Sequence, residues 1–224
     1  RSGMTTKAGI AHAELKTKQR AIREGFPPTM GLRVHRAISW IGRAETCGTD
    51  EDARFIFLWI AFNAAYAREF GHEQSERDQV RQFFEKVLSI DGGKRIHQLL
   101  FQRYTGPIRT LVDNRYLFEP FWRAMRDHDS SGRWEIAFND AKKAAMFAAT
   151  GSDTLKLISI VMDRLYVLRN QLVHGGATHA SKVNRQQVAD GVALLGDIVP
   201  LVIDLMLDGH HLDFGEIEYP VIPG

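Results

Sequence analysis

Apolar residues recur at steps of three and four along most of this chain, and this spacing constrains the fold more than any other feature. The segment between residues 153 and 173 shows it best, with apolar side chains at Ile158, Val161, Met162, Leu165, Leu168 and Leu172. Such steps place side chains on one face of an α-helix, whereas a half-buried strand needs alternation. No alternating segment is long enough for a sheet, and no internal repeat is evident. The sequence therefore predicts an all-α fold.

Length and composition indicate one helical domain with additions at both ends. Apolar residues make up 44% of the chain and charged residues 25%, as in ordinary globular proteins. Residues 1–3 precede Met4 and are interpreted as a cloning remnant. We expect a basic helix or arm over 4–28, ended by Pro27-Pro28, that docks loosely or exchanges between subunits. A helical bundle with extra short helices follows over 29–213, and an extended tail over 214–224.

Several classes of protein and site are excluded by what the sequence lacks. There is no apolar run of about 18 residues, so we expect no membrane span. There is no secretory leader, which points to the cytoplasm. Cys47 is the sole cysteine, and the histidines show no metal-ligand spacing, so we expect no metal and no cofactor. Asp91-Gly92-Gly93 is interpreted as a helix cap with left-handed glycines rather than a phosphate loop.

Charge is distributed unevenly along the chain. Residues 94–133 contain eight basic and four acidic side chains, whereas the chain from Gln186 onward has seven acids and neither lysine nor arginine. One interpretation is a polyanion-binding middle with an acidic end that shields it or faces a partner. The other, which we favour, is solvated helix faces that happen to segregate by charge.

Local signals place the remaining helices. Thr49 or Asp50 is a good N-cap for the next helix, which has Glu51 and Asp52 in its first turn and is rich in aromatic residues between Phe55 and Tyr66. Ser152 is a good N-cap for the 153–173 helix. Asn63 lies inside the aromatic-rich helix, where a buried amide with satisfied hydrogen bonds is a more common explanation than a functional asparagine.

Three polar residues at the end of the 153–173 helix form the strongest candidate site. Arg169, Asn170 and His174 come just before Gly175-Gly176, which are expected to stop the helix. Asn170 and His174 share a face, but Arg169 and His174 lie about 140° apart on an ideal helix. A joint site therefore needs a loosened last turn or a second copy of the helix. A purely structural role at the negative end of the helix is the alternative.

This pattern resembles the HEPN superfamily. The resemblance covers residues 33–208 and rests on Arg169-x-x-x-x-His174 with the polar Asn170 after the arginine, near the end of a late helix. The segments 36–40 and 57–66 are similar to a bacterial subgroup of stand-alone HEPN proteins. The resemblance implies that residues 29–213 form a HEPN-type bundle.

Many members of that superfamily are metal-independent endoribonucleases, often in toxin, defence or stress systems, and form homodimers through the motif helix. The resemblance implies that His174 acts as general base or acid while a ribose 2′-hydroxyl attacks the adjacent phosphate, leaving a 2′,3′-cyclic phosphate. It implies that Arg169 neutralises the phosphorane and that Asn170 positions His174 or a phosphate oxygen. Arg103, Arg109 and Arg115 are weaker candidates for holding the RNA backbone.

The partners implied are RNA, a second copy and an antitoxin or regulatory protein. Other members of the superfamily are not nucleases. The alternative function is therefore a non-catalytic HEPN scaffold that binds a protein partner or a small ligand.

Overall fold

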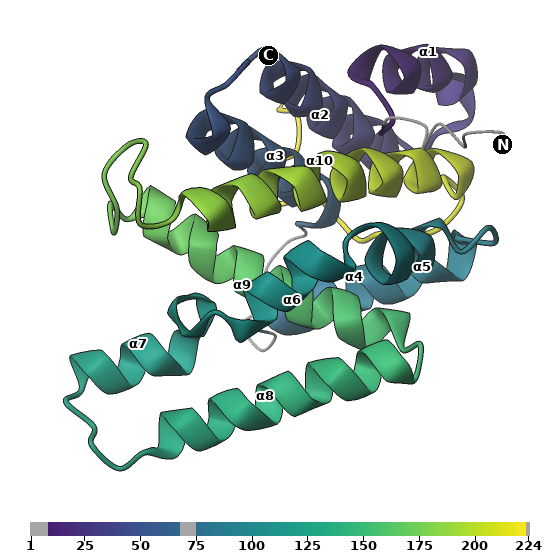
Figure 1. Cartoon of the computed structure of the whole chain (residues 1–224). Helices are drawn as coiled ribbons and strands as arrows, with labels where there is room; N and C mark the ends of the chain where they lie inside the picture. Colours follow the sequence, from purple (N-terminus) through teal and green to yellow (C-terminus); the bar gives the residue numbers. More distant parts are fainter. Residues whose placement is uncertain (1–8, 68–74, 223–224) are drawn as a thin grey trace, which may run out of the picture.

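The computed structural model describes residues 9–67 and 75–222, and all regular structure within these ranges is helical (Figure 1). This confirms the predicted all-α fold. The α-helices are α1 (His12–Ile22), α2 (Pro28–Glu45), α3 (Glu51–Tyr66), α4 (Glu76–Ile90), α5 (Arg95–Gln98), α6 (Thr105–Asp113), α7 (Glu119–Arg126), α8 (Arg133–Thr150), α9 (Thr154–Val173) and α10 (Arg185–Asp208). Short 3-10 or π turns follow α1, α5 and α6, at Arg23–Gly25, Leu99–Arg103 and Arg115–Leu117.

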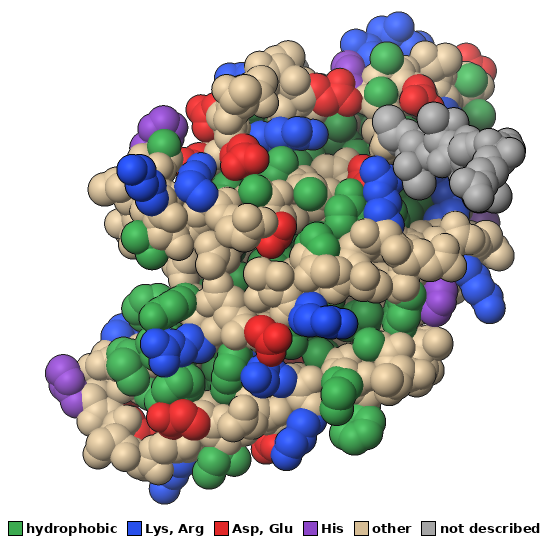
Figure 2. Space-filling view, viewed as in Figure 1, with side chains coloured by type: hydrophobic (Ala, Val, Ile, Leu, Met, Phe, Trp, Pro, Cys, Tyr) green, Lys and Arg blue, Asp and Glu red, His purple; other side chains and the backbone are tan. Residues whose placement is uncertain are grey.

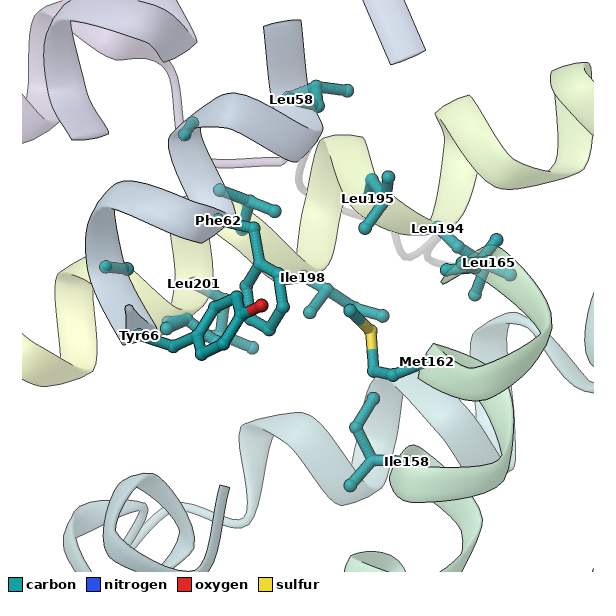
Figure 3. Packing of buried hydrophobic residues seen from close by; sticks show 14 of the residues in the cluster. Leu58, Phe62, Tyr66, Ile158, Met162, Leu165, Leu194, Leu195, Ile198 and Leu201 are labelled. Atoms are coloured by element: carbon teal, nitrogen blue, oxygen red, sulfur yellow. The ribbon is translucent and has the colours of Figure 1, made fainter. Parts of the chain in front are cut away.

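Helix α10 lies at the centre of the fold and packs against α2, α3, α4 and α6 (Figure 1). Its close approach to α3 depends on Gly191, where an added Cβ would lie 2.7 Å from the Phe55 ring. Figure 3 shows Phe62 and Tyr66 of α3 gathered with Ile198 of α10 and Met162 of α9. The core is therefore one continuous cluster shared by helices that are far apart in sequence.

Helices α2 and α3 form a hairpin beside α10. The Trp40 and Phe57 rings stack across it with centroids 5.5 Å apart. Asp50 caps α3 by accepting a hydrogen bond from the Ala53 amide at 3.0 Å, as one of the two predicted N-caps.

Helix α1 packs on its own chain, against α2 and α10. Leu15 is buried in the common core, and Lys18 Nζ lies 2.8 Å from Asp204 Oδ1 and 2.7 Å from Asp208 Oδ1. Both burial and charge thus hold α1 against the rest of the described chain.

The basic middle and the acidic last helix pair with each other. Arg95 Nη1 lies 2.7 Å from Asp204 Oδ2, and Arg103 Nη1 lies 3.1 Å from Asp197 Oδ2. Part of the basic middle and part of the acidic last helix therefore neutralise each other where the segment around α5 contacts α10. For Arg95 and Arg103, neither of the two sequence interpretations holds as stated, because these two charges are paired with acids of α10.

Arg33 joins the start of the C-terminal tail to the end of α3. Its guanidinium is buried and donates to the carbonyls of Ala65 and Ala67 and to those of Phe214, Gly215 and Glu216. The tail beyond it, up to residue 222, has no regular secondary structure.

Two predicted caps are wrong in detail. The left-handed residue before α5 is Lys94 with φ 51°, not a glycine, because the Asp91 carboxylate accepts from the Arg95 and Ile96 amides and fixes the turn. The N-cap of α9 is Asp153, which accepts from the Lys156 amide at 3.0 Å, while Ser152 takes a left-handed φ of 55°.

Candidate functional site

The three candidate residues lie at the C-terminal end of helix α9, with Arg169 and Asn170 in its last turn and His174 directly after it. Most of its length is buried, and its last turn emerges at the junction with the loop that leads to α10 (Figure 1). Gly175 has φ 68°, and its amide donates to the Leu172 carbonyl while the Gly176 amide donates to that of Gln171. These two bonds form a Schellman motif, so the glycines end the helix as predicted.

The last turn stays regular up to His174. The His174 amide still donates to the Asn170 carbonyl at 2.9 Å. Asn170 Oδ1 accepts from Arg169 Nη1 at 2.8 Å, and no hydrogen bond joins Arg169 to His174 in the described part of the chain. The expectation of a loosened last turn is therefore not met. Arg169 and Asn170 are half-buried, whereas His174 is exposed.

Arg169 faces aromatic rings rather than an acid. Its guanidinium carbon lies 5.7 Å from the centroid of the Tyr166 ring. Its positive charge also acts on Tyr66, whose hydroxyl donates to Glu76 Oε1 at 2.6 Å. Burial, together with the hydrogen bond to Glu76, raises the pKa of Tyr66, so this phenol stays protonated. Within residues 9–67 and 75–222, no carboxylate lies within ion-pair distance of Arg169.

Tyr166, Tyr66 and Glu76 were missed as site neighbours by sequence reasoning. The sequence could have predicted Tyr166 as a neighbour, since it precedes Arg169 by three residues and shares its helix face. Tyr66 belongs to another helix, and only the packing of α3 on α9 brings it to the arginine.

Asn63 differs from its expected role as a satisfied buried amide. Its Oδ1 is buried and has no hydrogen-bond partner among the described residues, and the same holds for Trp59 Nε1, one turn earlier on α3. Trp59 in turn lies against the Tyr166 ring, with centroids 6.2 Å apart. An unpaired acceptor and an unpaired donor therefore occupy the α3 face that packs near the motif arginine.

The loop after the motif is tied to the first turn of α3. Asp52 accepts from the Ala180 amide at 2.8 Å and from the Arg185 guanidinium. Asp50, Asp52 and His179 have potential ligand atoms within 4.8 Å of one another. Asp52 is already bonded to Arg185 and Asp50 caps α3, so both carboxylates have structural partners.

The structure separates the three arginines proposed to hold RNA. Arg103 pairs with Asp197, and Arg109 lies on α6, away from the motif. Arg115 alone is close to it: the carbonyl of the next residue, Tyr116, accepts from Gln171 Nε2 at 2.6 Å. Arg115 is exposed and stacks its guanidinium over the Tyr116 ring.

A groove of about 820 Å³ lies between α6 and α8. Leu100, Ile108, Val112 and Leu157 are among its apolar lining residues, and Arg109, Lys142 and Lys143 are its cationic ones. Leu157 belongs to the first turn of α9, so the groove lies at the opposite end of that helix from His174.

No known protein family, curated protein or solved structure matches the chain. Among the described helices, none combines the length and apolarity needed to cross a membrane.

Proposed function

We propose that this chain is a metal-independent endoribonuclease of HEPN type whose site is completed by a second copy. The observation that carries the proposal is the end of α9, which holds an arginine without an acidic partner among the described residues, an asparagine bonded to it and, directly after the helix, an exposed histidine. A guanidinium that is not neutralised by a carboxylate retains its full charge for a phosphate.

The chemistry needs only protein groups. A neutral His174 removes the proton from a ribose 2′-hydroxyl, the 2′-oxygen bonds to phosphorus, and the bond from phosphorus to the 5′-oxygen breaks. An imidazolium returns a proton to the leaving 5′-oxygen, so the products are a 2′,3′-cyclic phosphate and a 5′-hydroxyl. Arg169 stabilises the extra negative charge that develops on the phosphorane.

The geometry of the last turn supports a site shared with a second copy. Because the turn is regular, Arg169 and His174 are separated by about 7.5 Å along the helix axis and about 140° around it. One helix end therefore cannot direct both side chains at one phosphate. Two helix ends that face each other can place the arginine of one copy beside the histidine of the other. Exposed Val173, with 53% of its surface accessible, supplies an apolar contact for such a meeting.

The deciding experiment is RNA cleavage in EDTA by the parent and by Arg169→Ala, His174→Ala and His179→Ala. His179 is an exposed histidine of the same loop and is the matched control. We expect the first two variants to lose cleavage and the control to retain it, with cyclic phosphate ends on the products. Equal cleavage by all four proteins would mean that the site is wrong.

Mixing Arg169→Ala with His174→Ala tests the shared site directly. In half of the dimers one site then regains both residues, so cleavage should return to about a quarter of the parent rate. No recovery, although the two variants associate, would contradict a site made of one residue from each copy.

A second candidate function is a non-catalytic scaffold, and the α6–α8 groove favours it. Its volume and apolar lining are those of small-molecule sites, which commonly span about 300–1,000 Å³. A folded, RNA-inactive parent whose thermal unfolding is shifted upward by an amphipathic anion, and not shifted in Arg109→Ala, would support this function over the nuclease.

A further inference from the structure

Helix α8 exposes large apolar side chains both on its solvent-facing side and beside the α6–α8 groove, which Met146 lines. Ala145 and Ala148 are its only buried residues, whereas Ile136, Met146 and Phe147 are 65%, 58% and 69% exposed. Surface helices of globular proteins normally carry charged or polar residues there. Figure 2 shows hydrophobic side chains interspersed with both charge types along the lower edge of the molecule, where Figure 1 places α8.

Four of the exposed residues form a narrow line, which we call the α8 stripe: Ile136, Asp140, Lys143 and Phe147. They follow one another at steps of four, three and four, so their directions fall within about 60° around the helix axis. The centre of the stripe is turned about 140° around the helix axis from the side that buries Ala145 and Ala148, and Lys143 also lines the α6–α8 groove. Asp140 and Lys143 are both about two-thirds exposed, at 68% and 67% of their side-chain surface.

The order of the stripe is apolar, acidic, basic, apolar, and this order is complementary to itself when reversed. We propose that the α8 stripe is an interface for a second copy of this chain, with the two α8 helices antiparallel. A two-fold axis between Ala141 and Lys142 sets Ile136 of each copy against Phe147 of the other. The same axis sets Asp140 of each copy against Lys143 of the other.

The charges select the antiparallel arrangement. In a parallel pair Asp140 would face Asp140 and Lys143 would face Lys143, and like charges at a contact cost several kcal/mol. Within one chain Lys143 Nζ and Asp140 Oδ1 are 3.8 Å apart, an exposed pair that contributes little. Breaking this ion pair within each chain to form two ion pairs between copies therefore costs little. The new pairs, flanked by Ile136 and Phe147, fix the register of the two helices.

We infer that a second copy, rather than an unrelated amphipathic helix, binds the stripe. A reversed copy of the stripe places an acid against each base and Ile136 against Phe147, so the stripe is complementary to itself in charge and size. An 18-residue helix is about 27 Å long, so one pair of such helices buries an area at the low end of specific interfaces. We therefore expect a concentration-dependent association of micromolar strength. It uses a different helix from the motif and does not depend on the proposed nuclease activity.

The association is measured by sedimentation equilibrium over a wide protein range. All proteins carry Val173→Asp, which blocks the contact proposed at the end of α9. We expect Asp140→Lys and Lys143→Asp each to weaken association at least about tenfold, since each puts like charges face to face. Glu135→Lys is the matched control and should associate like the parent, because Glu135 precedes Ile136 but points about 100° away from it around the helix axis and has no partner in the described structure.

Two further measurements, each of which should restore association, distinguish this antiparallel register from a general effect of surface charge. The double variant with Asp140→Lys and Lys143→Asp restores opposite pairs and should associate like the parent. An equimolar mixture of the two single variants should form mixed dimers, because the lysine introduced in one variant then faces the aspartate introduced in the other. Helix content and thermal unfolding of each variant confirm folding, since all changed positions are exposed.

A parent that stays monomeric at every concentration would overturn the proposal. So would unchanged association in both single variants, or single variants that fail to associate when mixed.

Discussion

Arg95 Nη1 lies 2.7 Å from Asp204 Oδ2, and Lys18 Nζ reaches the other oxygen of the same carboxylate at 2.8 Å. Three segments that are far apart in the sequence thus meet at one side chain. The carboxylate is 14% exposed, so water screens these contacts only in part.

Asp204 should make stability depend on acid pH. Burial by itself raises the pKa of Asp204, but hydrogen bonds from Lys18 and Arg95 and their positive charges outweigh it and hold that pKa below its usual value. The contribution to stability is therefore full above about pH 4 and is lost as the pH falls through the folded pKa. We expect Asp204→Asn to be less stable than the parent in urea at pH 7, with the difference closing toward pH 2. Glu135→Gln should match the parent throughout, and a constant deficit of Asp204→Asn at every pH would contradict the linkage.

Asn170→Ala should reduce cleavage of RNA without unfolding the protein. The change removes the acceptor that holds Arg169 Nη1, and a hydrogen bond to a charged group contributes about 1.5–3 kcal/mol. We expect kcat/KM to fall about tenfold to a hundredfold. Asn139→Ala on α8 removes an exposed amide and should leave the rate unchanged. A parent-like rate for Asn170→Ala would show that the contact does not position the arginine.

Gly175→Ala should destabilise the protein by about 1–2 kcal/mol, because φ is 68° and a Cβ is strained in the left-handed region. The space around Gly175 is open, so this cost comes from the backbone alone. Gly92→Ala is the control: its surroundings are also open and its φ is not left-handed. The measurement is the urea midpoint, and equal effects of the two changes would rule out the stated cause.

Asn63→Leu should leave stability unchanged or raise it by about 1 kcal/mol. The change replaces a buried acceptor that has no partner with an apolar group of similar size. Asn63→Asp should lower stability, because burial disfavours a charged carboxylate. Urea unfolding of both variants beside the parent checks this. A large loss in the leucine variant would reveal a donor that reaches Oδ1 in solution.

Arg33→Met should lower the free energy of unfolding by more than about 3 kcal/mol, since several buried carbonyls lose a charged donor at once. The tail after residue 213 should also become sensitive to protease under native conditions. Arg133→Met, at an exposed position, is the comparison. An equally resistant tail would mean that Phe214 packing alone holds it.

Helix-level features followed from the sequence because they depend on neighbours in the chain. The spacing of apolar residues predicted α9, and Gly175-Gly176 predicted its end, since a left-handed cap needs only local backbone freedom. The failures were also local. Asp153 rather than Ser152 caps α9, because two adjacent residues competed for one role and their side chains differ little as acceptors.

The three candidate residues follow one another closely along the chain, so the sequence alone placed Arg169, Asn170 and His174 at the end of α9. Only the packing of α3 on α9 supplied Tyr66, and only the pairing of distant charges showed that Arg103 is occupied by Asp197 while Arg115 lies near the motif. Periodicity and caps are short-range and can be read along the chain. Contacts between distant segments determine which charges are neutralised and which helix faces remain exposed. Only the tertiary structure decided these features.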